Sequence, residues 1–269
     1  MLFLLVTLLV IVASLLAPRI AQPQSYHDFA DKREWLGIPN FGDVLSNLPF
    51  AMIGVWGLWC LLRRTPEKTR ALFLDPRERW PYVVIALGIL LTAFGSAYYH
   101  LAPDNTRLVW DRLPMTIVFM SLVAAMIAER ISVRVGLWLL PVLLLIGVAS
   151  VVQWHLSELL GAGDLRFYAA VQVYGVLVPL LVLLLPARYT RTSDLAVVAG
   201  WYILAKVLET FDKQILAASG HVVSGHTLKH LAAAMAGFWL LRMVQKRLPL
   251  GEARTEPRRQ AKERAVFSA

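Results

Sequence analysis

The stretch SGHTLKHLAAAMAGFWLL, residues 224–241, places two histidines and a lysine directly before an apolar run that no charged residue interrupts. His226 and His230 are four residues apart, so on a helix both imidazoles lie on one face. Ionisable side chains inside a membrane span are costly, and they usually mark a functional cavity. The stretch therefore predicts a membrane helix that carries part of a functional site.

The composition of the whole chain agrees with a membrane protein. Of its 269 residues, 58% are hydrophobic, and the mean hydropathy is +0.58, well above the values of water-soluble domains. A helix needs about 20 mostly apolar residues to cross a bilayer. The sequence contains eight such runs, so we expect an all-α, polytopic helical bundle with spans near residues 1–17, 42–62, 81–100, 108–128, 135–154, 168–186, 195–215 and 226–243.

The first apolar run, MLFLLVTLLVIVASLLA, is open to two interpretations. No Lys or Arg precedes it, and Pro18 follows the only small-residue cleavage position, so an uncleaved helix is favoured over a signal peptide. The single cysteine, Cys60, excludes an intramolecular disulfide. We expect an additional N-terminal helix with its linker in residues 1–25, a seven-span domain in 26–248, and a basic cytoplasmic tail in 249–269.

The basic residues predict the orientation of the bundle, because Lys and Arg near span ends remain on the cytoplasmic side. One set of loops and the C-terminal tail together hold 18 of them, whereas the opposite loops hold six. This difference predicts both termini in the cytoplasm and an even number of spans. We expect an integral, multi-pass protein of a bacterial inner membrane, with its active site toward the non-cytoplasmic side. The net charge of +9 then reflects topology and attraction to the inner leaflet. Because no nucleic-acid-binding fold accompanies the basic tail, we expect no nucleic-acid partner.

Three polar segments fall at the same, non-cytoplasmic end of the predicted spans. FGSAYYH ends the span near 81–100, LVWDRLP begins the span near 108–128, and SGHTLKH begins the last span. The spans were assigned from apolar runs and loop charge alone, so this coincidence is an independent observation. We therefore expect the polar side chains of these segments to form one site.

The chemistry of that predicted site follows from its residue types. His100, His226 and His230 would supply three neutral nitrogen ligands, which leave zinc a fourth, open position. Zinc held in this way activates water and polarises a carbonyl, so hydrolysis of an ester or amide is the natural reaction. Asp111 would take the proton of the water or orient it. Ser96 would donate to the oxyanion that develops on the carbonyl.

Each of these residues also has a purely structural interpretation. An H-x3-H pair is common in helices without a metal. Asp111 can form an interfacial ion pair with Arg112, and Ser96 can bond back to its own helix, which is the more frequent role of an intramembrane serine. Lys206, Glu209 and Asp212 fall at i, i+3 and i+6 and are expected to form an ion network, and Lys229 is expected to pair with one of these acids or to extend to the headgroups.

Taken together, the S-x3-H motif, an aspartate eleven residues after its histidine and a late H-x3-H resemble the alkaline ceramidase family. That family belongs to a superfamily of seven-span hydrolases that includes adiponectin-receptor-like and Per1-like proteins. The segments GSAYYHLAPDNTRLVWDRLP and SGHTLKHL carry the resemblance, which covers residues 26–243. It implies that the three histidines bind Zn²⁺, that Asp111 engages the water that the metal activates, and that Ser96 stabilises the reacting carbonyl.

The resemblance also implies a substrate and a second metal. The substrate class would be ceramide-like N-acyl lipids, cut at the amide into a fatty acid and an amino lipid. Related ceramidases bind Ca²⁺ in an acidic segment before the first core helix. Here Asp31, Glu34 and Asn40 could supply oxygen ligands for calcium. Lys32 and Arg33 intervene, however, so a plain solvated loop is the alternative.

Two other functions are compatible with these residues. A lipid esterase or phospholipase could use the same scaffold, because the metal chemistry barely distinguishes an ester from an amide. A lipid-sensing, receptor-like protein could instead hold a structural zinc ion. Release of fatty acid from a lipid by the purified protein would separate the enzymes from the sensor.

Overall fold

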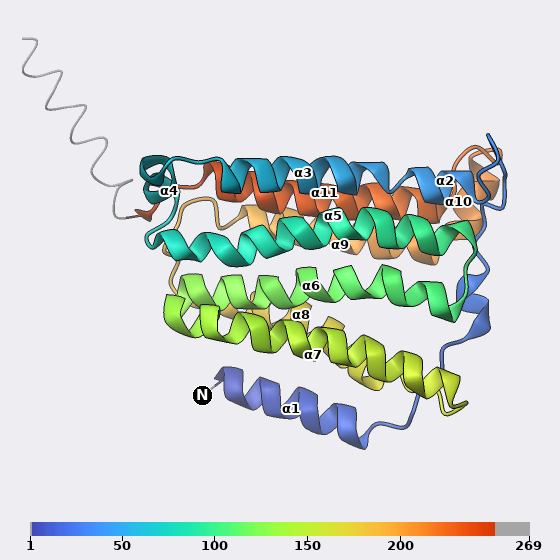
Figure 1. Cartoon of the computed structure of the whole chain (residues 1–269), viewed down its shortest axis with the longest axis horizontal. Coiled ribbons are helices and arrows are strands. Elements are labelled where there is room, and N and C mark those ends of the chain that lie inside the picture. The colour runs from blue at the N-terminus through green and yellow to red at the C-terminus, as the bar shows by residue number, and fades with distance from the viewer. Residues whose placement is uncertain (1, 251–269) are drawn as a thin grey trace, which may run out of the picture.

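A computed structural model describes residues 2–250, and the described residues form an all-α bundle without a β-strand (Figure 1). Residues 251–269, which make up most of the predicted basic tail, lie outside the described part of the chain. The helices are α1 Leu2–Leu16, η1 Gln24–His27, α2 Phe41–Leu45, α3 Leu48–Leu62, α4 Pro66–Leu72, η2 Pro76–Glu78, α5 Arg79–Leu101, α6 Asn105–Arg130, α7 Val133–Leu159, α8 Arg166–Val182, α9 Asp194–Thr210, α10 Asp212–Ala218 and α11 Gly225–Lys246.

A helix forms at each of the eight ranges that the sequence predicted as spans. Four stretches are long and apolar enough to cross a membrane, namely Phe41–Leu62, Pro76–Leu101, Asn105–Arg130 and Val133–Leu159. Leu4–Leu16 and Arg166–Val182 are shorter apolar helices. Helix α9 has 17 residues, and α11 has 22 but includes two histidines and a lysine in its first two turns. The structure therefore supports a membrane protein with at least these four candidate spans.

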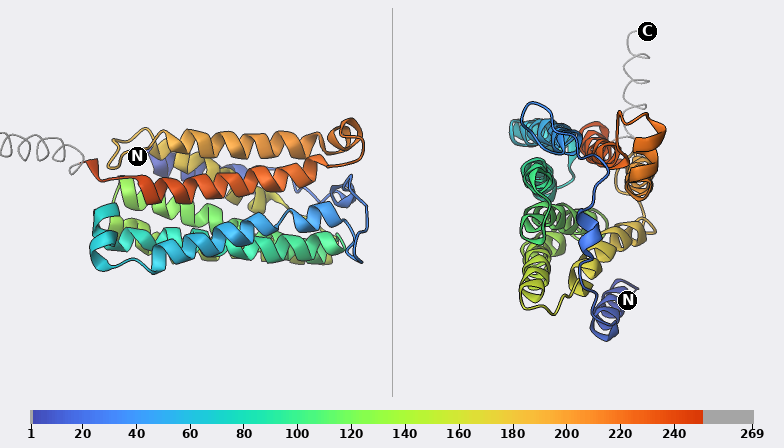
Figure 2. Two further views of the ribbon diagram at one scale, coloured as in Figure 1. Left: turned by 90° about the horizontal axis from the view of Figure 1, so that it is seen from above. Right: turned by 90° about the vertical axis from the view of Figure 1, so that its right-hand side faces the viewer.

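The long helices run side by side, so that the bundle has two distinct ends (Figure 1). We call the end that holds α2, α10 and the turn between α5 and α6 the histidine end, and the end that holds α4 the basic end. The linker between α1 and α2 crosses the histidine end, between the α5–α6 side and the α8–α9 side of the bundle (Figure 2). The start of α11 and the end of α5 thus lie under this linker.

Two of the predicted spans are interrupted. The first break falls at Ser46 and Asn47, where the Asn47 side chain donates to the backbone carbonyl of Asp43 at 2.8 Å. Helix α3 then begins at Leu48, with Pro49 in its first turn. The second falls at Phe211, between α9 and α10. Both breaks lie at the histidine end (Figure 1). Asp43, before the first break, and Asp212, after the second, both bond to the first turn of α11.

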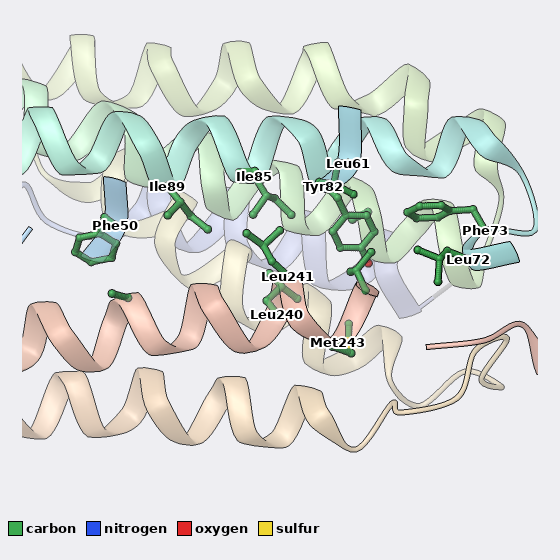
Figure 3. Packing of buried hydrophobic residues seen from close by; sticks show 14 of the residues in the cluster. Phe50, Leu61, Leu72, Phe73, Tyr82, Ile85, Ile89, Leu240, Leu241 and Met243 are labelled. Atoms are coloured by element: carbon green, nitrogen blue, oxygen red, sulfur yellow. The ribbon is translucent and has the colours of Figure 1, made fainter. Parts of the chain in front are cut away.

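One apolar cluster lies between α3, α4, α5 and α11 (Figure 3), and a second lies between α6, α7 and α8. Leu61, Ile85 and Leu241 are buried in the first cluster from three different helices. Helix α1 lies at the periphery of the bundle and packs on α8 (Figure 1), where the Thr7 hydroxyl is 3.0 Å from that of Tyr174. The additional N-terminal helix therefore does not contribute to the packing around the ends of α5 and α11.

A buried polar cluster closes the basic end. The Arg247 guanidinium pairs with the Glu129 carboxylate, which also accepts a hydrogen bond from Tyr82 at 2.5 Å. Arg247 also stacks on the Tyr189 ring, 4.0 Å from its centroid. Beyond α11 the chain pairs with the loop before α9, because Leu250 N–H donates to the Arg188 carbonyl at 3.0 Å. These contacts attach the end of α11 to α5, α6 and this loop.

Candidate metal centre

Three histidines from two helices meet at the histidine end. His100 is the next-to-last residue of α5, whereas His226 and His230 lie in the first two turns of α11. Ser224 is the N-cap of α11, and its hydroxyl accepts a hydrogen bond from the backbone N–H of Thr227 at 2.9 Å. This cap fixes the first turn of α11, which carries His226.

The three imidazoles are close enough to share one ion. One ligand nitrogen from each of His100, His226 and His230 lies within 4.8 Å of the others, and all three residues are buried. The Nε2 atoms of His100 and His226 are 3.2 Å apart. Two nitrogens bound to tetrahedral zinc at 2.0–2.1 Å are about 3.3–3.4 Å apart. The group could therefore hold a metal ion, and the spacing of this pair matches that of zinc ligands.

The hydrogen bonds of Ser46 select the tautomer of His230. The Ser46 hydroxyl donates to the Asp43 carbonyl at 3.1 Å, so its oxygen accepts from His230 Nδ1–H at 2.8 Å. The proton on Nδ1 leaves the lone pair of Nε2 free for a metal. Outer partners of this kind orient metal-binding histidines and raise their basicity. Ser46 was missed by the sequence analysis, although its place at i+3 from Asp43, at the start of a span, was a usable signal.

Aromatic side chains cover the histidines. The Phe29 ring, from the linker that crosses the histidine end, lies 4.3 Å from the His226 ring and 4.7 Å from the His100 ring between centroids. The Phe50 ring of α3 lies 6.3 Å from the His230 ring between centroids. These rings separate the imidazoles from bulk water, and the low polarity strengthens electrostatic interactions inside the site.

Ser96 and Asp111, the two residues predicted to act in catalysis, lie on neighbouring parts of α5 and α6. Asp111 is buried near the start of α6, and its carboxylate lies close to the Ser96 side chain of α5. The close approach of the two helices depends on Gly95, because a Cβ at this position would lie 2.0 Å from the Trp110 carbonyl oxygen. Arg112 points elsewhere, donating to Gln22 at 2.6 Å. The roles of Ser96 and Asp111 stay predictions.

A chain of charges extends from α9 to the histidines. Glu209 pairs with Lys206 at 2.7 Å and with Lys229 at 3.0 Å, which confirms the expected pairing of Lys229 with an acid. The expectation that Asp212 belongs to this network is wrong. Helix α9 ends before Asp212, whose carboxylate instead accepts from the backbone N–H groups of Ala30 at 2.9 Å and His226 at 2.8 Å.

The residues considered for calcium have protein partners. Both oxygens of Asp31 accept from the Arg33 guanidinium at 2.7 Å. Burial alone would raise the pKa of Asp31, but the hydrogen bonds and charge of Arg33 outweigh it and hold the pKa below its usual value. The Asn40 amide donates to the His100 carbonyl at 2.8 Å, and Glu34 is exposed. Calcium binding by Asp31, Glu34 and Asn40 stays a prediction.

A second buried acid near the histidines was not identified from the sequence. Asp43 is fully buried, and its Oδ1 accepts from the hydroxyls of Ser224 at 3.0 Å and Thr227 at 2.7 Å. Through these bonds α2 is attached to the first turn of α11. Asp43 therefore helps to position both His226 and His230, which follow in the same turns.

Comparison with known proteins does not assign the chain to a family. No protein-family model matches the chain, and no curated protein matches it. The residues described above are therefore the basis for any functional conclusion.

Proposed function

We propose that the protein is an integral membrane hydrolase that uses zinc to cut the amide bond of N-acyl lipids. The observation that carries this proposal is the group of three buried imidazoles, from His100, His226 and His230, whose ligand nitrogens lie within 4.8 Å of one another. Three nitrogen ligands are the set that catalytic zinc sites use, because the ion keeps an open position. A structural zinc ion usually has four protein ligands.

The proposed topology has eight spans, with both termini in the cytoplasm of a bacterial cell. The helices at all eight predicted ranges support it, as does the excess of Lys and Arg in the loops of the basic end. In this orientation the histidines lie near the non-cytoplasmic face of the inner membrane. A lipid could then bring its amide to the site while its acyl chain stays in apolar surroundings.

Zinc, when bound, would polarise the lipid carbonyl and lower the pKa of a water to about 7. The chain supplies the proton transfers and the orientation. The Asp111 carboxylate accepts the proton of the attacking water and passes a proton to the leaving nitrogen. The Ser96 hydroxyl, which lies close to Asp111, donates to the carbonyl oxygen and stabilises the charge that develops there.

The proposed substrate class rests on the resemblance to alkaline ceramidases. The matching residues are Ser96, His100, Asp111, His226 and His230, at the spacing of that family. We therefore propose a ceramide-like N-acyl lipid, cleaved to a free fatty acid and an amino lipid. Esters would meet the same chemistry, so a matched N-acyl and O-acyl pair of lipids should be compared.

The test measures fatty acid release by purified, zinc-loaded protein in detergent from N-acyl lipids, O-acyl lipids and phospholipids. We expect release from the N-acyl lipids that is lost in His230→Ala and in Asp111→Asn. His155→Ala is the matched control, because this histidine lies at the same end of the bundle on α7. Tight lipid binding without hydrolysis by wild-type protein would favour a sensor, and hydrolysis restricted to O-acyl lipids would favour an esterase.

A further inference from the structure

The Arg33 side chain connects the linker between α1 and α2 to the loop between α10 and α11. Its guanidinium donates to both carboxylate oxygens of Asp31, each at 2.7 Å. It also donates to the backbone carbonyls of His221 at 2.6 Å and Val222 at 3.0 Å. Two carboxylate oxygens and two main-chain oxygens therefore bind this one cation. Carboxylates and main-chain carbonyls are also the ligands that calcium takes in proteins.

The oxygens considered for calcium are not arranged to hold that ion. Calcium takes about six to eight oxygen ligands. Both oxygens of Asp31 bind Arg33, and Glu34 is exposed. Among residues 2–250, no group of three carboxylates, thiols or imidazoles other than the histidines lies close enough to share an ion. A calcium ion would have to displace the guanidinium from a buried carboxylate.

The carboxylate that Arg33 binds lies where the linker meets both α2 and α11. Asp31 is fully buried, and its Oδ2 would lie 2.4 Å from a Cβ added at Gly42 of α2. The Thr227 hydroxyl of α11, which donates to the buried Asp43, would lie 2.9 Å from the same Cβ. A buried carboxylate is costly without a paired cation. Arg33 supplies that cation for Asp31 from within the linker itself.

The same part of the linker covers the histidines (Figure 2). The Phe29 ring lies 4.3 Å from the His226 ring between centroids. The N–H of the next residue, Ala30, donates to Asp212 at 2.9 Å. Arg33 follows three residues later and binds the linker to the loop after α10. Loss of the Arg33 bonds should therefore loosen the aromatic cover of the candidate metal centre.

We propose that Arg33 is a built-in cation that holds the linker over the histidines, so that the protein needs no calcium ion at this place. The inference goes beyond the proposed function and does not depend on lipid cleavage. It excludes the calcium site predicted from Asp31, Glu34 and Asn40, because the Asp31 carboxylate already binds a cation. Unlike a bound ion, a guanidinium that is part of the chain cannot be removed by a chelator or by a fall in calcium concentration.

Calcium titration of the wild-type protein tests the first part of this proposal. The purified, zinc-loaded full chain in detergent is freed of calcium and titrated with calcium chloride to about 10 mM, above the dissociation constants of weak protein calcium sites. We expect no binding heat beyond that of magnesium chloride and no change in the unfolding temperature. Saturable uptake of one calcium ion per chain, with a rise in the unfolding temperature, would overturn the proposal.

Hydrogen exchange of the linker tests the second part. Arg33→Met removes the four bonds of the guanidinium, so the amides of the linker around Ala30 should exchange at least about tenfold faster. The amides of α6 and α7 should exchange at the wild-type rate. Lys32→Met is the matched control, because Lys32 is the adjacent cation but pairs with the exposed Asp28. Its exchange should match that of wild type.

Wild-type exchange of the linker in Arg33→Met would overturn the proposal, because the guanidinium would then not hold this segment. The calcium titration uses wild-type protein, so it decides the first part even if Arg33→Met does not fold. Neither measurement involves a lipid substrate. Failure of the proposed hydrolase therefore leaves this inference standing, and its failure leaves the hydrolase standing.

Discussion

Replacing Gly95 by alanine should separate α5 from α6 at the point where Ser96 meets Asp111. The added Cβ would lie 2.0 Å from the Trp110 carbonyl oxygen and 2.8 Å from its carbon, both of them backbone atoms. Ordinary contact begins at 3.4 Å, so the two helices have to move apart by about 1.4 Å. The histidines lie on α5 and α11, and the metal should therefore remain bound.

The size of the effect follows from this displacement. Overpacking of a tight interface lowers the free energy of unfolding by about 1–3 kcal/mol. Misplacement of a catalytic group by about 1 Å can reduce a rate roughly 100-fold. We therefore expect Gly95→Ala to release fatty acid about 100-fold more slowly than wild type and to bind as much zinc, because Asp111 and Ser96 no longer act together.

Gly200→Ala is the matched control, since Gly200 is also in a helix but its added Cβ would meet nothing within 4 Å. This control should be neutral or more stable by up to about 1 kcal/mol. Chemical unfolding in detergent, zinc analysis and fatty acid release measure the three quantities. Wild-type stability and wild-type activity in Gly95→Ala would refute the described approach of α5 to α6.

Three further perturbations probe the rest of the structure. Ser46→Ala removes the partner of a histidine Nδ1–H and should weaken zinc binding about 10–100-fold in a chelator competition; unchanged affinity would rule out this role. Arg247→Met leaves Glu129 buried without its cation and should lower unfolding free energy by about 3–5 kcal/mol, whereas changing both residues to apolar ones should recover most of the loss. The pKa of Asp31 in the folded protein is lowered from 3.8, so its pairing with Arg33 should stabilise the fold fully above pH 3.8 and progressively less below it. In Arg33→Met, unfolding free energy should no longer fall with pH in this range. If it falls as in wild type, the loss of stability belongs to other groups.

The sequence predicted the helices and the histidines because both depend on local patterns. Apolar runs of spanning length locate each helix, and an H-x3-H spacing places two imidazoles on one face wherever the helix lies. His100 could be assigned to the same end of the bundle because successive spans cross the membrane in opposite directions. His100, His226 and His230 were therefore within reach of sequence reasoning, whereas the distance between them required the packing of α5 on α11.

The contacts that sequence reasoning missed join segments far apart in the chain. Asp212 was expected on the face of Glu209, but α9 ends without a nearby proline or glycine, and the Asp212 carboxylate binds backbone N–H groups of Ala30 and His226. The spacing of residues along one helix cannot predict a hydrogen bond to the backbone of a distant segment. The same holds for Phe29, which covers the histidines from a linker without regular structure, and for the pairing of Arg247 with a carboxylate on α6.

X-ray absorption at the zinc edge, measured on the purified protein and on His230→Ala, tests the metal centre most directly. We predict a single zinc ion per chain with three imidazole nitrogens at about 2.0–2.1 Å, and a loss of most of the zinc from the variant. A wild-type protein that takes up no zinc, or a variant with the same zinc content and the same imidazole signal, would contradict the assignment of this ion to His100, His226 and His230.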